Sequence, residues 1–233
     1  MTNQSNSFNS QHIPAVIAGI SLIIMGMAAA FSYGYVHNSL VVSAEAVITL
    51  QNIEASLSLF QLGILGWVVI ILSDILVSWA FYVFLKPIHR ELSLLAGWLR
   101  LIYTAILAMA VSHLLISSNL VRQQMSGEVT ELAPSDIMAS MSAFDSIWSL
   151  GLIIFGAHLI LIGIIALKSN YIPKVISILL VIAGGSYMLT HVLHGFVPQL
   201  DKTTSLIEMV LIIPMTIGEL AFGIWLLLKG RKI

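Results

Sequence analysis

The stretch Tyr187–Pro198, YMLTHVLHGFVP, carries two histidines three residues apart near the end of a long apolar run. On a helix, His191 and His194 share one face, because residues i and i+3 are neighbours there. Imidazoles so placed can bind a divalent metal ion or haem, or they can rest at a membrane surface with their polar atoms among the headgroups. The spacing is not that of the H-E-x-x-H zinc motif, so the local pattern leaves these interpretations open.

Six further ionisable side chains interrupt apolar runs: Asp74, Arg100, His113, Asp145, His158 and Glu219. Such groups cost at least a few kcal/mol each at bilayer depth, so they normally face protein and find partners. At about 1.5 Å of helix rise per residue, the whole set falls into two layers, counted from the predicted cytoplasmic end of each run. The inner layer, at roughly 10–18 Å, holds Asp74, Arg100, His158 and Glu219, and the outer layer, at roughly 27–33 Å, holds His113, Asp145, His191 and His194.

In the inner layer, Arg100 has five donors and keeps its proton, so a carboxylate at matching depth is its natural partner. Asp74 and Glu219 both qualify, and His158 can bridge as donor and acceptor. Such a cluster can relay a proton or ion, clamp an anionic ligand, or serve as a polar staple between helices. One cation among two acids can be satisfied within the cluster, so the sequence alone favours the staple.

The outer layer offers three imidazoles and one carboxylate, from His113, Asp145, His191 and His194. That set suits zinc or another divalent ion that prefers imidazole, and bis-histidine haem ligation from two helices is a further alternative. An unknown polar ligand is also conceivable. The plain interpretation needs no ligand, because polar-tipped rings are ordinary at the headgroup level.

The composition identifies the environment of these residues. Of 233 residues, 58% are hydrophobic and 9% are charged, whereas soluble domains carry about 25% charged residues. A formal net charge of −1 leaves no basic excess for nucleic acid. The absence of cysteine from the sequence excludes disulfides, thiolate metal sites and cysteine nucleophiles. The chain is therefore expected to be an integral membrane protein.

Six runs are long enough to cross the hydrocarbon, which takes roughly 20 residues. They form one predicted six-helix domain over residues 14–233, after a polar, loose tail over residues 1–13. Pro173 should lie just before the fifth helix, and Pro214 should kink the sixth. Close packing between helices is expected at Gly156, Gly163 and the pair Gly184-Gly185. The predicted spans are Pro14–Tyr35, Leu59–Leu85, Leu94–Ser117, Ile137–Leu167, Val175–Phe196 and Leu206–Leu228.

The basic residues predict the orientation. Seven of the nine Lys and Arg residues outside the spans lie in alternate loops and at the carboxyl terminus, which places both termini in the cytoplasm. No Lys or Arg precedes the first run, so we expect a retained helix and not a cleaved signal peptide. The first external loop, SAEAVITLQNIEASLSLF, spaces its apolar residues three to four apart, which predicts a short amphipathic helix on the outer surface or an extension of the second helix.

Several phrases carry a family resemblance. TLQNIEASLSLFQLGILG and LSDILVSWAFYVFLKPIHRELSLLAGWLRLIYTAIL resemble the first half, and FGAHLILIG, KSNYIP and GELAFGIWLLLKG the second half, of domain of unknown function 4386. This uncharacterised bacterial membrane-protein family implies a multi-helix inner-membrane protein from bacteria or archaea, and it brings no reaction, ligand or cofactor.

The resemblance also bears on individual residues. Asp74, Arg100, Asp145, His158 and Glu219 sit in recognisable family phrases, and His194 falls where members often carry a histidine. His113 and His191 match no family position, so a three-histidine metal site would be peculiar to this chain, which weakens the metal hypothesis.

The sequence thus predicts an all-α polytopic membrane protein with six transmembrane helices, located in the cell inner membrane. We expect a non-enzymatic role, as a packing or partner-binding module or as a carrier of a small solute or ion, built on Asp74, Arg100, His158 and Glu219. The alternative is a membrane metalloprotein or enzyme with zinc or haem near the outer face. We otherwise expect no cofactor and no nucleic-acid partner, with the lipid bilayer as the principal partner and a small molecule or ion as the candidate ligand.

Overall fold

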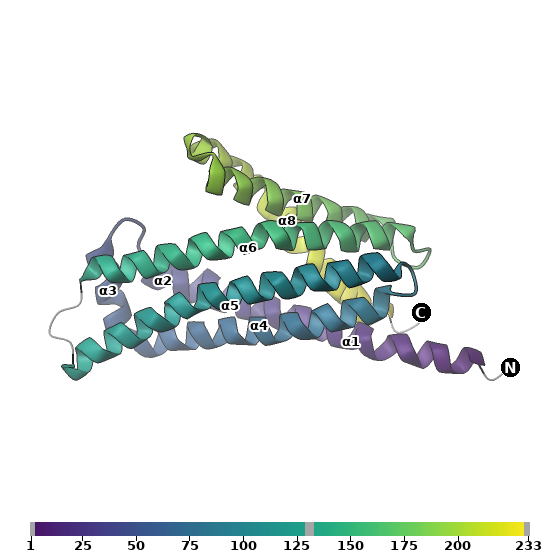
Figure 1. Cartoon of the computed structure of the whole chain (residues 1–233), viewed down its shortest axis with the longest axis horizontal. Helices are drawn as coiled ribbons and strands as arrows, with labels where there is room; N and C mark the ends of the chain where they lie inside the picture. Colours follow the sequence, from purple (N-terminus) through teal and green to yellow (C-terminus); the bar gives the residue numbers. More distant parts are fainter. Residues whose placement is uncertain (1–2, 129–132, 231–233) are drawn as a thin grey trace. The chain divides into compact units, whose positions relative to one another are not determined.

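The computed structural model describes residues 3–128 and 133–230, and these residues are helical apart from short connections (Figure 1). The all-α prediction is confirmed. In chain order the elements are α1 (Asn3–Ala29), the π-helix η1 (Ala30–His37), α2 (Asn38–Leu40), α3 (Ala46–Ala55), α4 (Leu57–Leu85), α5 (Arg90–Ser126), α6 (Pro134–Lys168), α7 (Lys174–Phe196), the 3-10 turn η2 (Pro198–Leu200) and α8 (Asp201–Leu228).

The six predicted transmembrane runs are confirmed as helices long and apolar enough to cross a membrane. All six extend beyond the predicted bounds at one end or both, because a helix continues past the apolar stretch into flanking polar residues that reach the headgroups. The spans found in the structure are Gln11–Leu40, Leu57–Leu85, Arg90–Ser126, Pro134–Lys168, Lys174–Phe196 and Lys202–Leu228.

The amino-terminal segment differs from the loose tail expected from its composition. α1 begins at Asn3 and runs without interruption through the polar residues into the first apolar run. Pro14 lies inside α1, where its missing N–H removes one hydrogen bond of the helix.

The first loop between apolar runs is helical, as its spacing predicted. α3 buries Thr49, Leu50 and Ile53 and exposes Val47 and Ile48. A single turn residue, Ser56, separates α3 from α4, and its non-helical backbone marks the break. The segment is thus a separate short helix, as in the first predicted alternative, but it adjoins α4 directly, which resembles the second.

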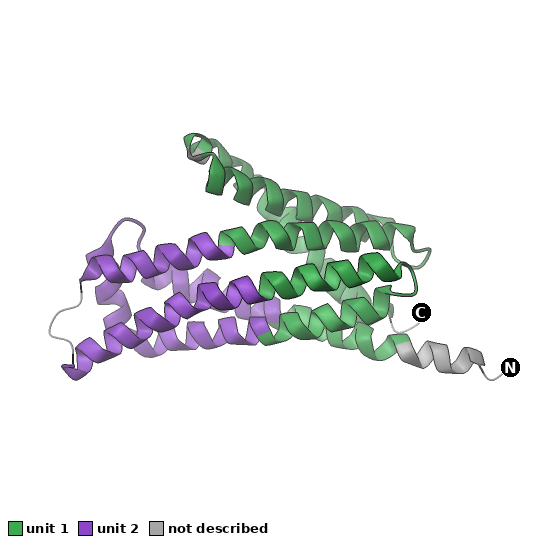
Figure 2. Ribbon diagram, in the orientation of Figure 1, with its two compact units in different colours: residues 1–24, 72–104, 149–233 green, residues 25–71, 105–148 purple. Residues whose placement is uncertain are grey.

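Two compact units divide the described chain, and α1, α4, α5 and α6 each contribute to both (Figure 2). Unit 1 contains residues 1–24, 72–104 and 149–233, and unit 2 contains residues 25–71 and 105–148. In unit 2, Trp67 of α4 lies in edge contact with Tyr33 of η1 and with Phe144 and Trp148 of α6.

Within unit 1, glycines allow α6 and α7 to approach closely. A Cβ atom at Gly156 would lie 2.6 Å from the carbonyl oxygen of Gly184, and one at Gly163 would lie 2.8 Å from the carbonyl oxygen of Ser177. The predicted packing role is therefore confirmed for Gly156, Gly163 and Gly184. It is wrong for Gly185, since a Cβ there would meet nothing within 4 Å in the described part of the chain.

The two predicted prolines lie at the expected places on α7 and α8. Pro173 is the residue immediately before α7, and Pro214 lies within α8. α7 and α8 form an antiparallel hairpin through η2 (green and yellow in Figure 1). Gly218 of α8 packs closely against Ala183 and Leu179 of α7.

Candidate functional site: a buried ionic network

Four helices of unit 1 each supply one side chain to a buried ionic network, defined as Asp74, Arg100, His158 and Glu219. Asp74 comes from α4, Arg100 from α5, His158 from α6 and Glu219 from α8. These are the four residues that depth counting had placed in the inner layer, and the structure brings all of them together.

The backbones that carry the network are held close by small residues. Ser78, one turn beyond Asp74, donates a 2.8 Å hydrogen bond to the carbonyl oxygen of Gly97, which lies one turn before Arg100. Gly218, beside Glu219, allows α8 to approach α7. Small residues at these crossings let the ionic groups meet across helix axes.

The Arg100 guanidinium is the centre of the network. Its Nε donates to Oδ1 of Asp74 at 2.8 Å, and its Nη2 lies 2.7 Å from the same oxygen. Its Nη1 donates to Oε1 of Glu219 at 2.6 Å. The side chains of Arg100 and Asp74 are fully buried, while that of Glu219 keeps 16% of its surface exposed.

The hydrogen bonds of His158 define its protonation state. Its Nδ1 lies 2.8 Å from the carbonyl oxygen of Ala96, which can only accept, so Nδ1 carries the proton. Its Nε2 lies 3.1 Å from Nη1 of Arg100, which can only donate, so Nε2 is the acceptor. Both ring nitrogens are thereby satisfied by a neutral imidazole, and His158 adds no charge to the network.

Aromatic rings enclose the guanidinium. The Cζ atom of Arg100 lies 5.7 Å from the ring centre of Phe81 and 5.4 Å from that of Phe155. Both phenylalanines also stack on the His158 ring. These rings exclude water and attract the cation through their π faces, so the charges interact in a medium of low polarity.

The charges of the network do not balance if both acids are ionised. One guanidinium faces two carboxylates, and His158 is neutral. The second oxygen of Asp74, Oδ2, is buried and has no hydrogen-bond partner among residues 3–128 and 133–230. A carboxyl group with one oxygen bound to arginine and the other unsatisfied can take up a proton or a small cation.

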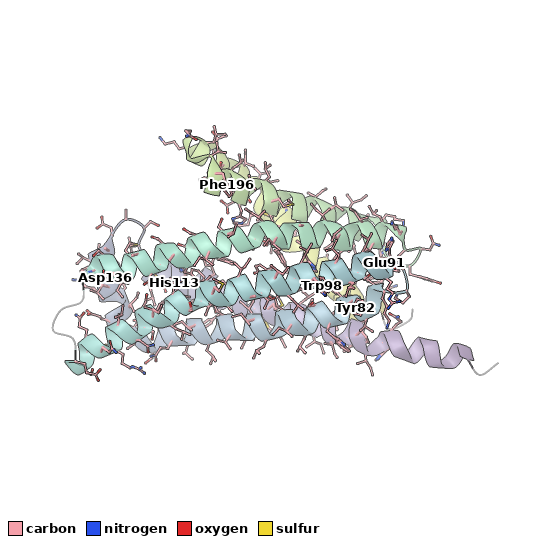
Figure 3. The ribbon with its side chains drawn as sticks, in the orientation of Figure 1. Tyr82, Glu91, Trp98, His113, Asp136 and Phe196 are labelled. Carbon is pink, nitrogen blue, oxygen red and sulfur yellow. The ribbon has the colours of Figure 1, made fainter. Side chains whose placement is uncertain are left out.

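The four outer-layer candidates are divided between the units. His191 and His194 belong to unit 1, whereas Asp145 of α6 and His113 of α5 belong to unit 2. Of the four, His113 is labelled in Figure 3. The partners seen in unit 1 are Ser149, whose Oγ lies 2.9 Å from Nδ1 of His191, and Glu208, whose Oε2 lies 3.1 Å from Nε2 of His194.

Over the described residues, no group of three or more His, Asp or Glu side chains is arranged to hold a metal ion. Binding of zinc or haem by His113, Asp145, His191 and His194 stays a prediction from their residue types, which metal analysis of the purified protein would test.

Sequence reasoning missed several residues around these groups. Phe81 and Phe155 read as ordinary core residues, because nothing in an apolar run shows which ring faces a cation. Glu208 lies in the first turns of the sixth run, and its position opposite His194 depends on the register of the α7–α8 hairpin. Tyr187 could have been found, since it precedes His191 by four residues and therefore shares its helix face.

Comparisons with known proteins give the same family as the sequence phrases. An uncharacterised protein of Archaeoglobus fulgidus is 29% identical over 193 residues, which cover 82% of this chain and 95% of the relative. No solved structure matches the chain. The family model named Domain of unknown function (DUF4386) matches residues 17–230. Because this match spans nearly the whole chain, the protein belongs to the DUF4386 family.

Proposed function

We propose that this protein is a non-enzymatic carrier in which the buried ionic network takes up and releases a proton as part of moving a small ion or solute across the membrane. The observation that carries the proposal is the excess carboxylate. Asp74 and Glu219 share one guanidinium, and Oδ2 of Asp74 is buried without a partner in the described structure.

The energetics of burial favour proton binding over a purely structural role. A polar staple needs one carboxylate for one arginine, and a second ionised acid would leave a net negative charge at bilayer depth. Uncompensated charge there costs at least a few kcal/mol, and buried groups respond by becoming neutral. One additional proton shared by Asp74 and Glu219 removes the excess, so the network is suited to alternate between protonated and ionised forms.

The proposal includes a location and an orientation. Basic residues gather in alternate loops and at the carboxyl terminus, which supports a cytoplasmic membrane with both termini in the cytoplasm. With this orientation, the turn between α7 and α8 faces the outside of the cell.

The function can be tested by proton flux into vesicles. The purified protein is reconstituted into liposomes that contain a pH-sensitive dye, and a potassium diffusion potential drives protons inward. We expect wild-type vesicles to acidify faster than empty ones, and Asp74→Asn to return the rate to that of empty vesicles, because the amide keeps the shape but cannot take up the proton.

Glu91→Gln provides the matched control, because it also converts an acid to its amide on an exposed side chain at the start of α5 (Figure 3). This variant should behave as wild type. The proposal fails if wild-type and empty vesicles acidify at the same rate, or if Asp74→Asn carries protons as fast as the unmodified protein.

A further inference from the structure

A column of titratable side chains lines the α7–α8 hairpin and leads from its turn toward the buried ionic network. Tyr187, His191 and His194 lie at positions i, i+4 and i+7 of α7, which places them on one face. Glu208 and Glu219 are 11 residues apart on α8, close to three helical turns, so they also share a face. The column extends over roughly 16 Å along α8 at the usual helix rise.

Contacts connect the members of this column. At the turn, Nε2 of His194 lies 3.1 Å from Oε2 of Glu208. The ring of His191 stacks on that of Tyr187, with centres 6.2 Å apart and an interplanar angle of 12°. The ring of Tyr187 also meets that of Phe155 edge-on, with centres 5.3 Å apart, and Phe155 covers the Arg100 guanidinium, so the column reaches the network there.

Exposure falls along the column from the turn inward. The side chain of Glu208 is 39% exposed and that of His194 is 31% exposed. Glu219 retains 16%, and Asp74 and Arg100 have none. A series of titratable groups that begins in solvent and ends at a buried carboxyl pair is the arrangement that a proton path requires.

We propose that protons reach the buried network from the α7–α8 turn, through Glu208 and His194, then His191, then Tyr187, to Glu219. This route rests on the proton exchange proposed above, and it identifies the point at which the proton enters the protein. The entry lies at the end of unit 1 that carries Phe196, away from Glu91 and the α4–α5 loop (Figure 3).

The transfers balance without any further reactant. Each imidazole accepts a proton on one nitrogen and releases one from the other. The Tyr187 hydroxyl group donates its proton to the Glu219 carboxylate and regains one from His191. After one transfer the terminal carboxyl group is protonated and each imidazole holds the opposite tautomer, which rotation of the ring resets. Where two groups of the route lie more than about 3.5 Å apart, a single water molecule can bridge them.

The groups around each step come from several helices. His191 lies in hydrogen-bond contact with Ser149 of α6 and stacks on Tyr187 of α7, and Glu208 of α8 and His194 of α7 are within electrostatic reach of it. Glu219 binds Arg100 of α5, which also binds Asp74 of α4. Among these, Arg100 is the fixed cation, so the mobile proton belongs to the imidazoles, the phenol and the carboxyl groups.

The test uses the vesicle flux assay with Tyr187→Phe, which keeps the stacked ring and removes only the hydroxyl group. We expect the proton flux to fall at least about tenfold, as the loss of a proton-transfer group does in general acid–base steps. Tyr82→Phe, near the other end of unit 1 (Figure 3), is the matched control and should keep the wild-type rate.

A second variant separates proton transfer from structural support. His191→Ala should slow the flux by a similar factor, and added imidazole should restore it, because a small base can occupy the vacated position. A purely structural histidine would not be rescued in this way.

The two proposals can fail separately. If Tyr187→Phe and His191→Ala conduct like wild type while wild type exceeds empty vesicles, the route is wrong and the proton-exchanging network stands. If wild type itself equals empty vesicles, both are wrong. A His191→Ala flux that stays low when imidazole is added also contradicts the route.

Discussion

At the scale of single residues, Arg100 determines the state of the network. Its guanidinium is fully buried and binds a carboxyl group on each of two helices, α4 and α8. The neutral His158 and two phenylalanine rings fill the remaining space around it. Arginine suits this position better than lysine, since its planar fork reaches several acceptors at once and it keeps its charge under all physiological conditions.

Replacing Arg100 by alanine should destabilise the fold by about 3–5 kcal/mol, because buried carboxyl groups lose their compensating charge. Thermal unfolding in detergent should show a lower midpoint for Arg100→Ala, and adding Asp74→Asn should recover part of the loss. Arg90→Ala, on an exposed side chain at the start of α5, serves as the control. Equal midpoints for Arg100→Ala and wild type would contradict the proposed pairing.

At the scale of elements, glycine positions decide which helices can meet. Gly156 of α6 and Gly184 of α7 face each other, so that a Cβ on Gly156 would lie 2.6 Å from the backbone of its partner. Backbone atoms cannot move aside as flexible side chains do, and this contact therefore defines the spacing of α6 and α7. The same helices carry His158 and the column at Tyr187, so their spacing positions both proposed sites.

Gly184→Ala should destabilise the protein by about 1–3 kcal/mol through overpacking against α6. Gly185→Ala should not destabilise the protein, because no described atom outside its own stretch of helix lies within 4 Å of a Cβ there. The neighbouring residues make a matched pair, and thermal unfolding of the two variants in one detergent would compare them. A similar loss of stability in both would contradict the packing explanation, because alanine has the higher helix propensity at either position.

The sequence predicts the helices of this protein well, and it predicts the contacts between their side chains less well. Composition identifies membrane spans because each run must match the thickness of the hydrocarbon, and depth counting grouped Asp74, Arg100, His158 and Glu219 correctly. The sequence of a single apolar run does not show how its helix is rotated about its axis or how it is aligned with the neighbouring helices. The rings around Arg100, the tautomer of His158 and the unsatisfied Oδ2 of Asp74 therefore became visible only in the structure.

At the scale of the whole molecule, the distribution of basic residues predicts the topology. Lys168 is the last residue of α6, at the end of the helices predicted to face the cytoplasm, and Lys202 lies at the start of α8, on the predicted outer side. Both side chains are exposed. The chain has no cysteine, so a single introduced thiol can report the side of the membrane without any background.

In intact cells, Lys202→Cys should react with a membrane-impermeant maleimide, and Lys168→Cys should react only after permeabilisation. This result would place the entrance to the α7–α8 column outside the cell. The opposite labelling pattern would invert the topology and would place the proposed proton entry on the cytoplasmic side.

The measurement that tests the central claim most directly is infrared detection of a protonated carboxyl group at neutral pH. We predict that the wild-type protein shows the C=O stretching band of a buried carboxylic acid. Both Asp74→Asn and Glu219→Gln should lose this band, because the remaining acid then ionises against Arg100. Asp136→Asn, at an exposed acid of α6, should retain it. Spectra in which wild type lacks the band, or in which both network variants keep it, would contradict a shared proton in the buried ionic network.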